Sequence, residues 1–432
     1  MSNKKPGKND IAWETLFEQY RILDIIDQQG YFEIESTQIN EERESRLMAK
    51  FDHSVNLPQI FKDHNLSILP ISRSKYIIGC FDAYLNVEYS TDIETIDIEF
   101  PSYIESIDYT HLYSEASAIS CAFNTGIIND LLGEETLFTL SGRMSSGCFD
   151  FKIKNKNSLN PHSDPISVIN SQCEIDGGFE SENYLILIEA KKYKVDDFVI
   201  RQLYYPYRLW SQKITKKVIP VLMTYSNDIF SFFIYEFQNE SDYNSLRLIE
   251  QKNYIIAPEE ITQQDISDIC ETITLIPEPS IPFPQANNFE RVIDLLSLLV
   301  ERDLTKEEIT ENYQFDQRQT GYYTNAGQYL GLVEKYKAVG TGDITFRLTQ
   351  EAGEILSKRQ KNKYLSLIRK ILEHQVFNTV FQLNLSRGKM PSKGEICQII
   401  LSCRADIQKT TPGRRQSTVS NWIYWIFKQI QD

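Results

Sequence analysis

The spacing of apolar and polar residues divides the chain into three stretches of different character. In the first, residues 1–105, apolar residues recur every three to four positions in AWETLFEQYRILDIIDQQG (12–30) and NEERESRLMAKFDH (40–53), which predicts two helices. Gly30 stands where a glycine commonly ends a helix. Short alternating runs such as SKYIIGCFDAYLNVEY (74–89) then predict strands, so we expect an α+β region here.

The second stretch, residues 106–274, has the rhythm of an α/β domain. A helical pattern over 113–132 precedes the alternating runs TLFTLSG and GCFDFKI and the short strand QCEID. YLILIEA (184–190) is almost continuously apolar, as in a strand buried on both faces. The helix VDDFVIRQLYY, which we expect to break at Pro206, precedes the strands KVIPVLMTY and IFSFFIYEF. This order predicts an α/β sandwich, a mixed sheet flanked by helices.

A proline-rich linker is expected at residues 275–288, because four prolines there fix φ and remove donors. Residues 289–360 predict three helices, FERVIDLLSLLVE, TKEEITENY and QRQTGYYTNAGQYLGLV, and a glycine-tipped hairpin, AVGTGDITFRLT. Thr305 and Glu308 form a capping box for the second helix. Three helices and a hairpin are typical of a winged helix-turn-helix. The helical pattern of residues 361–432 predicts a second, basic, winged-helix-like unit.

Charge is distributed unevenly along the 432 residues. The formal net charge is −15, yet residues 355–432 hold 14 Lys and Arg against 4 Asp and Glu. This asymmetry is expected when one part contacts phosphate and another holds metal-binding carboxylates. An acidic protein with a chance basic cluster is the alternative. The seven cysteines contain no CxxC pair, and no apolar run reaches the ~18 residues of a membrane span, so we expect a cytoplasmic protein without zinc module or disulfide framework.

The sharpest candidate for chemistry lies where two expected strands end. Asp176 ends QCEID, and Glu189 and Lys191 end the apolar strand. Residues i and i+2 of a strand point to the same side, so Glu189 and Lys191 project together and the intervening hairpin brings Asp176 beside them. Paired carboxylates favour a hard divalent cation such as Mg²⁺, and a lysine can orient water or stabilise charge on phosphorus. The alternative is a strand end running into solvent.

At these residues the chain resembles the PD-(D/E)xK nuclease superfamily and, within it, type II restriction endonucleases. The likeness covers roughly residues 110–240 and is carried by QCEIDGGFESENYLILIEAKK, DDFVIRQLYYPYRLW and SGRMSSGCFDFKI. The resemblance implies a restriction-endonuclease-like core in which Asp176 and Glu189 bind Mg²⁺ and Lys191 is the catalytic lysine. Glu115, on the preceding helix, matches the further carboxylate that some members add.

The first acidic position of the motif departs from the family pattern. Ile175 stands where the superfamily's name has proline, and that proline varies widely among its members. Glu174, two residues before Asp176 and on the same strand face, is the competing choice for the first acidic residue. We favour Asp176 because it lies at the strand end.

Further polar residues are candidates for DNA contacts, with an ordinary solvated surface as the alternative. Some lie beside the expected active site, and others begin the two expected recognition helices, where polar residues meet base edges. We expect His53 to be a surface histidine. The candidate contacts are Arg143, Arg201, Gln202, Arg318, Gln319, Thr320, Arg414, Arg415 and Gln416.

The sequence therefore predicts a Mg²⁺-dependent type II restriction endonuclease that cuts double-stranded DNA at a specific sequence. Cutting both strands needs two active sites or a rearrangement of one, so we expect a homodimer, and the resemblance implies a cognate DNA methyltransferase as functional partner. Residues 1–105 are a candidate for additional DNA contacts. The alternatives are a repair or defence nuclease without sequence specificity, and a winged-helix DNA-binding regulator that keeps an inactive nuclease fold.

Overall fold

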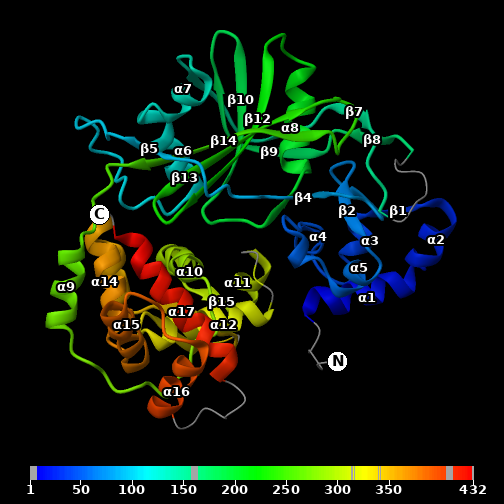
Figure 1. The fold of residues 1–432 in the computed structure, drawn as a ribbon. Helices are drawn as coiled ribbons and strands as arrows, with labels where there is room; N and C mark the ends of the chain where they lie inside the picture. The colour runs from blue at the N-terminus through cyan, green and yellow to red at the C-terminus, as the bar shows by residue number, and fades with distance from the viewer. Residues whose placement is uncertain are drawn as a thin grey trace.

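The computed structural model describes residues 7–156, 164–312, 315, 317–338, 340, 342–404 and 412–430. The protein is a mixed α/β structure of three units, which we name the N-terminal unit (7–79), the central unit (80–257) and the C-terminal unit (258–430). In Figure 1 the large sheet of the central unit lies above, the N-terminal unit to the right and the helical C-terminal unit below on the left. Each unit therefore contacts the other two around a common centre.

The N-terminal unit is a small α+β fold. Its three strands form an antiparallel sheet in the order β1-β3-β2, and its core centres on Trp13, Phe17 and Phe61, whose rings meet edge to face at 4.9–6.0 Å. Such pairs add to the burial of the rings themselves. The elements are α1 (Lys8–Gln19), α2 (Ile22–Gln29), β1 (Tyr31–Glu35), α3 (Ser36–Ile39), α4 (Ser45–Met48), a 3-10 turn (Ser54–Asn56), α5 (Gln59–Asp63), β2 (Ser67–Pro70) and β3 (Lys75–Gly79).

The two helices expected in this unit are only partly confirmed. The pattern of 12–30 forms helices, but the chain turns between α1 and α2 at Arg21, which adopts a φ of 50°. Gly30 ends α2 at a φ of 87°, as predicted. The expected helix over 40–53 was wrong, because only α4 is helical there. The run NEERES has no apolar face to bury, and the residues after α4 bond to the central unit instead.

The central unit is built on a seven-stranded mixed sheet in the order β5-β14-β13-β12-β10-β9-β6. Strand β10 pairs antiparallel with β9 and parallel with β12, as a crossover through a helix requires. The seven strands are β5 (Thr95–Ile98), β6 (Leu137–Ser145), β9 (Gln172–Glu180), β10 (Tyr184–Lys191), β12 (Lys217–Ser226), β13 (Ile229–Phe237) and β14 (Leu246–Ile256). Two small pairs flank them: β4 (Tyr84–Asn86) with β11 (Asp197–Val199), and β7 (Cys148–Phe151) with β8 (Ile166–Ile169).

Helices cover both faces of this sheet. On one face α6 (Glu115–Asn124) and α7 (Ile127–Leu132) pack against Ile186 and Ile188 of β10. On the other face α8 (Arg201–Ser211) lies over Leu185 and Leu187. The prediction that β10 is buried on both faces is thus confirmed, and its alternate residues must point to two different layers.

Helix α8 differs from its predicted form in both bounds. It begins at Arg201, because the preceding residues form β11, and it continues through Pro206 to Ser211. The expected break at Pro206 was therefore wrong. Tyr204, Tyr205 and Arg208 on the same helix are buried, and their packing holds the helix together across the hydrogen bond that proline cannot make.

The C-terminal unit begins with α9 (Gln263–Thr272), and the proline-rich residues 275–288 that follow form neither helix nor extended ladder. The next elements are α10 (Phe289–Glu301), β15 (Leu304–Thr305), α11 (Lys306–Asn312), α12 (Gln317–Tyr329), β16 (Val333–Lys337) and β17 (Ile344–Leu348). The three strands pair in the order β15-β17-β16. Bonds between Thr305 and Glu308, at 2.8 and 3.1 Å, confirm the predicted capping box.

The rest of this unit is helical in the described residues of 349–404 and 412–430. Its helices are α13 (Gln350–Leu356), α14 (Gln360–Leu372), α15 (Gln375–Arg387), α16 (Lys393–Cys403) and α17 (Pro412–Gln429). No strand hairpin follows α17 within that range, so the wing expected of a second winged-helix-like unit is not found there. Across the described residues, no helix combines the length and the apolar character needed to cross a membrane.

Strand β5 bears on the expected domain limits. It adds to the large sheet through a parallel pairing with β14, so residues 95–98 belong to the central unit although they precede the expected start at 106.

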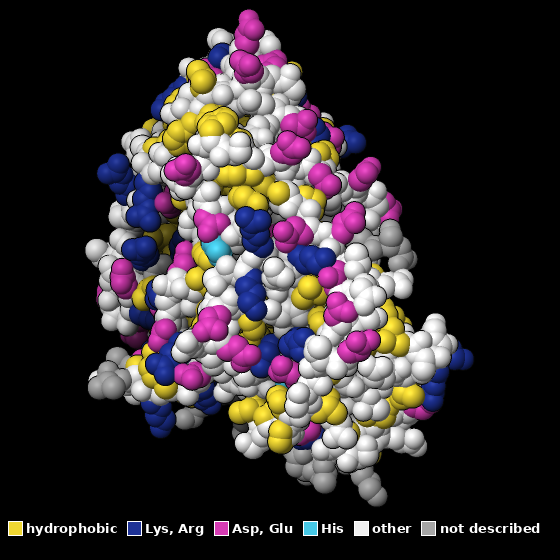
Figure 2. Space-filling model, turned by 90° about the vertical axis from the view of Figure 1, so that its left-hand side faces the viewer, with side chains coloured by type: hydrophobic (Ala, Val, Ile, Leu, Met, Phe, Trp, Pro, Cys, Tyr) yellow, Lys and Arg dark blue, Asp and Glu magenta, His cyan; other side chains and the backbone are white. Residues whose placement is uncertain are grey.

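Figure 2 shows the side of the molecule that lies at the left in Figure 1, where basic and acidic side chains are interspersed. That face carries no field of a single sign.

Candidate active site

The three units surround a cleft of about 830 Å³. Its floor is formed by the first half of β9, the end of β10 and the start of α8, and its walls come from the N-terminal unit and from the end of α10. The expected catalytic residues Asp176, Glu189 and Lys191 all line it. The expectation that Asp176 ends its strand was wrong, because β9 continues to Glu180 and Asp176 lies in its middle. The pairing of β9 with the end of β10 nevertheless brings the three residues to one cleft, the kind of place where active sites commonly lie.

The three residues meet as the strand pattern predicts. The Lys191 ammonium donates to Glu189 Oε1 at 2.5 Å, and both side chains are less than 10% exposed. Asp176 Oδ2 accepts a hydrogen bond of 2.8 Å from the backbone N–H of Ala190, the residue between Glu189 and Lys191. Alternation along β10 therefore places Glu189 and Lys191 on the α8 side of the sheet, and the β9–β10 pairing brings Asp176 next to them.

Burial and crowding of like charges set the protonation of this cluster. Burial raises the pKa of Glu189 to about 8, and the neighbouring Asp176 adds to the shift while Lys191 opposes it. Burial likewise raises the pKa of Asp176. Burial alone would lower the pKa of Lys191, but the surrounding carboxylates outweigh it and raise the pKa well above 10.5. Lys191 is therefore an ammonium at neutral pH, held among acidic groups that repel one another.

Two residues of the flanking helices complete the floor of the cleft. Glu115 is the first residue of α6, behind the N-cap Ser114, and burial raises its pKa. Gln202 of α8 donates from Nε2 to Glu189 Oε1 at 2.5 Å, while its own Oε1 is buried without a hydrogen-bond partner. Arg201, its neighbour, also lines the cleft. Gln202, a candidate DNA contact in the sequence, therefore holds the Glu189 carboxylate here.

The acidic cluster was tested for its fit to a divalent cation. In the part of the chain that the structure describes, no group of three or more His, Cys, Asp or Glu side chains is arranged to hold a metal ion. The chemistry of the donors does fit one, since the carboxylates of Asp176 and Glu189 both line the cleft and each shows hydrogen bonds to only one of its two oxygens. Their raised pKa values express a local excess of negative charge that a hard cation would relieve.

The competing first acidic residue, Glu174, lies apart from this cluster. Its carboxylate bonds to Arg143 of β6 at 3.2 Å, and the two side chains are 47% and 57% exposed. Asp176, in contrast, is tied to the strand that carries Glu189. The geometry therefore favours Asp176, and it places Arg143 at the mouth of the cleft with Glu174 as its partner.

The rim of the cleft is rich in cations from all three units. The N-terminal unit contributes side chains that sequence reasoning did not identify, and the C-terminal unit contributes one at the end of α10. A polyanion in the cleft would find positive side chains from all three units along its walls, some of them paired with acids. The cations that line the cleft, besides Lys191, are Arg46, Lys50, Arg73, Arg143, Lys192, Arg201 and Arg302.

The candidates on α12 differ from one another in exposure. Arg318 is exposed and donates to the hydroxyl of Tyr322, one turn further along the helix. Gln319 is half-buried. Thr320 is fully buried and shares a hydrogen bond of 2.9 Å with Thr310 of α11, so it is not available for the base contact expected of it. Its hydroxyl joins two helices instead.

The candidates on α17 show the same division. Arg414 is exposed and Arg415 is half-buried, whereas Gln416 is buried at 9% exposure and cannot meet a base edge in this arrangement. Trp422, two turns further on, donates to the backbone oxygen of Ala286 at 2.7 Å. One side of this helix is thus engaged in the core of the C-terminal unit, and the other side reaches the surface, as Arg414 and Tyr424 show.

The N-terminal unit inserts Asp52 and His53 into the wall of the cleft. His53 was expected at the surface, which was wrong: it is 2% exposed, its Nδ1 donates to the backbone oxygen of Asp197 at 2.6 Å, and its Nε2 lies 3.1 Å from the Tyr193 hydroxyl. These contacts join residues about 140 positions apart, so no local sequence pattern indicates them.

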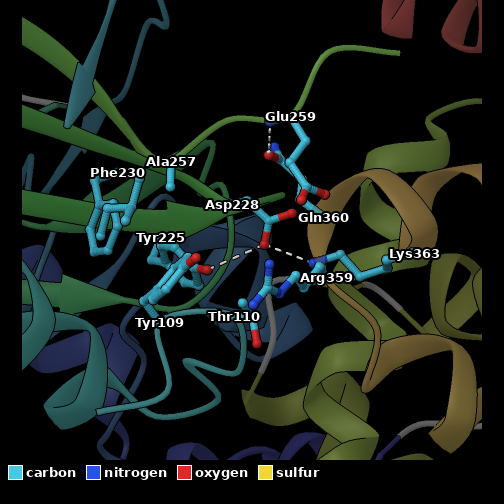
Figure 3. A pocket seen from close by; sticks show the side chains of 11 residues that line it. Tyr109, Thr110, Tyr225, Asp228, Phe230, Ala257, Glu259, Arg359, Gln360 and Lys363 are labelled. Atoms are coloured by element: carbon cyan, nitrogen blue, oxygen red, sulfur yellow. Dashed lines mark hydrogen bonds and ion pairs between the residues drawn. The ribbon is translucent and has the colours of Figure 1, made fainter. Parts of the chain in front are cut away.

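A second, smaller pocket lies between the central sheet and α14. Figure 3 shows Asp228 at its centre, bonded to Tyr225 at 3.3 Å and to Lys363 at 2.7 Å. Its volume of about 30 Å³ is that of one water molecule. The buried Asp228–Lys363 pair therefore serves to join the central and C-terminal units rather than to bind a substrate.

Comparison with known proteins gives three family models and no relative of known activity. The models are DUF6996 at residues 10–78, DUF6997 at 79–255 and DUF7226 at 291–431, each described as a domain of unknown function. The first two match the N-terminal and central units closely, and the third begins within α10 of the C-terminal unit, after α9 and the proline-rich segment. No curated protein and no solved structure matches the chain.

Proposed function

We propose that this protein is a Mg²⁺-dependent endonuclease that hydrolyses phosphodiester bonds of double-stranded DNA at a specific sequence, in the manner of a type II restriction enzyme. The observation that carries the proposal is the buried Glu189–Lys191 pair, with Asp176 beside it, at the floor of a cleft whose rim is cationic. A structural ion pair would have no need of further carboxylates around it. A phosphodiester site needs both signs of charge at close range.

The order of elements around the site supports a restriction-endonuclease-like core. Helix α6 precedes β6, β9 and β10, and α8 then leads to β12, which lies parallel to β10. Among the described residues, α7, the β7–β8 pair and the short strand β11 interrupt this series. It is the order of helix, strands, helix and strand that the resemblance to PD-(D/E)xK nucleases implies.

The residues of the site have separable roles in this proposal. Asp176 and Glu189 would hold the Mg²⁺, which when bound stabilises the charge that develops on the phosphate. Gln202 and the backbone N–H of Ala190 keep the two carboxylates oriented. Lys191, kept protonated by its acidic neighbours, donates to the attacking water or to a phosphate oxygen. Glu115 borders the cluster as a further acceptor.

The C-terminal unit supplies the candidate for sequence reading. The order α10, β15, α11, α12 and the β16–β17 hairpin supports a winged helix, with α12 as recognition helix. Arg318 is the exposed base-reading candidate there. Arg414 is also exposed, and both arginines would contribute a salt-dependent attraction to DNA. A homodimer would supply the second active site that cleavage of both strands needs, and a methyltransferase in the same cytoplasm would protect the host.

The test is digestion of plasmid DNA by the purified full chain in Mg²⁺ and in EDTA, with Lys191→Ala and a matched control. Lys216→Ala serves as control, because Lys216 is also ion-paired, to Glu180 at 2.6 Å, but lies outside the cleft. Discrete fragments that need Mg²⁺ and vanish only in Lys191→Ala are expected. A smear would instead favour a nuclease without sequence specificity. DNA binding without any cleavage by the unmodified protein would favour a winged-helix regulator and contradict the enzyme.

A further inference from the structure

A carboxylate of the N-terminal unit reaches the candidate active site from outside the nuclease-like core. Asp52 lines the same cleft as Lys191, and its side chain is 23% exposed. One of its carboxylate oxygens, Oδ2, lies 3.7 Å from the Lys50 ammonium. The other, Oδ1, is buried and has no hydrogen-bond partner. A buried carboxylate oxygen without a donor is costly, so its position calls for a function.

The segment that carries Asp52 is held firmly against the central unit. Its backbone oxygen accepts from the N–H of Val199 at 2.9 Å, and the adjacent His53 bonds to Asp197 at 2.6 Å. Tyr84 donates to the backbone oxygen of Phe51 at 2.9 Å. These bonds hold the segment against the β4–β11 pair. Strand β11 leads directly into α8, which carries Arg201 and Gln202 of the cleft. The position of Asp52 is therefore fixed by the central unit, not left to a surface loop.

The charges around Asp52 connect it with the catalytic lysine. Burial alone would raise the pKa of Asp52, but nearby cations lower it, and Lys191 has the largest effect, followed by Lys50 and Arg201. Conversely, Asp52 is one of the carboxylates on the cleft that, with Glu189, raise the pKa of the Lys191 ammonium. Lys191 has three N–H donors, and the structure shows one of them in use, to Glu189.

We infer that Asp52 is a positioning residue for Lys191. Asp52 accepts the lysine ammonium when the Glu189 carboxylate binds a divalent cation. This inference rests on the proposed function and deepens it. Glu189 Oε1 already accepts two hydrogen bonds of 2.5 Å, and a cation on this carboxylate would compete with the ammonium for it. A buried ammonium that loses its partner needs another carboxylate nearby. The unpartnered Oδ1 of Asp52 is that acceptor, and it would aim the lysine across the cleft.

The first experiment separates positioning from binding. Asp52→Asn keeps the shape and removes the charge, Asp52→Glu restores the charge, and Asp24→Asn is the matched control, since Asp24 is an exposed acid of the same unit outside the cleft. Single-turnover cleavage by Asp52→Asn should slow by roughly 10–100-fold, with the Kd for duplex DNA in Ca²⁺ within about twofold of the unmodified value. Asp52→Glu should recover part of the rate, and Asp24→Asn all of it. An unchanged rate in Asp52→Asn would overturn the inference.

The second experiment does not depend on nuclease activity. A double-mutant cycle of Asp52→Asn and Lys191→Met is measured by urea unfolding of the full chain, in EDTA and in Ca²⁺. The unfolding constants should be coupled by about tenfold or more in Ca²⁺ and by less in EDTA. Additivity within about twofold in both media would refute the link between the two side chains even if the protein cuts DNA. Coupling in a protein that never cuts DNA would contradict the proposed function and leave the Asp52–Lys191 link in place.

Discussion

A buried carboxylate at the junction of the central and C-terminal units predicts a specific dependence of stability on pH. Asp294 of α10 is 5% exposed and accepts a hydrogen bond of 2.8 Å from the Ser226 hydroxyl at the end of β12. Burial, with a contribution from Glu290, raises its pKa from 3.8 to about 7. The native protein therefore keeps this group protonated at a pH where the unfolded chain has already released the proton.

The sign and size of the effect follow from that difference. A group whose pKa is higher in the folded state contributes stability that is complete below the unfolded pKa and is lost as the pH rises through the folded pKa. For values of 3.8 and about 7 the full contribution is about 4 kcal/mol, since each pKa unit is worth about 1.4 kcal/mol. About 1.4 kcal/mol of it is lost between pH 6 and 9, away from the pI near 5.0 where solubility is lowest.

Asp294→Asn removes the titration but keeps an acceptor for Ser226. Urea unfolding followed by tryptophan fluorescence is measured at pH 6, 7, 8 and 9 for both proteins. The free energy of unfolding of the variant, relative to the unmodified protein, should rise by about 1.4 kcal/mol over this range. Asp268→Asn, an exposed acid on α9, is the control and should show no such trend. Parallel pH profiles for Asp294→Asn and the unmodified protein would refute the reasoning.

Two further predictions concern DNA affinity and helix packing. Arg73→Glu, at the cleft rim, should weaken duplex binding and lower the slope of log K against log salt by about one. Arg247→Glu, outside the cleft, should change neither. Equal slopes for the two variants in a fluorescence anisotropy titration would contradict a role for the rim. Gly327→Ala on α12 would set its Cβ 2.5 Å from Val333, and should destabilise the protein by about 1–3 kcal/mol in urea unfolding. Gly321→Ala on the same helix meets nothing within 4 Å and should be neutral or stabilising, so equal effects of the two changes would exclude the packing of α12 on β16.

The parts of the fold that could be predicted are those in which a local pattern and the final environment agree. Helix α10 covers the predicted residues because its apolar positions recur at helical spacing and Asn288 caps it. Strand β10 was predicted from one apolar run, and the same run explains why Glu189 and Lys191, at its end, share a side. A short-range pattern was sufficient because these side chains depend mainly on their own element.

Predictions failed where a distant segment decides the environment. The residues around His53 were expected in a helix with a solvated histidine, but β11 and Tyr193 supply hydrogen bonds that neither helix nor solvent could match. Thr320 and Gln416 were expected at the surface because polar residues begin recognition helices. The structure buries both, since the hydroxyl of Thr320 has an acceptor on α11 and Gln416 lies on the inner side of α17.

The same argument explains why the active site could be predicted only in part. Asp176, Glu189 and Lys191 lie within 16 residues and are joined by one hairpin, so strand geometry alone brings them together. Asp52 lies 137 positions before Glu189 and in a different unit, and no spacing rule connects them. If the inferred exchange of the lysine ammonium is correct, the N-terminal unit belongs to the catalytic site, because it supplies the second acceptor for Lys191.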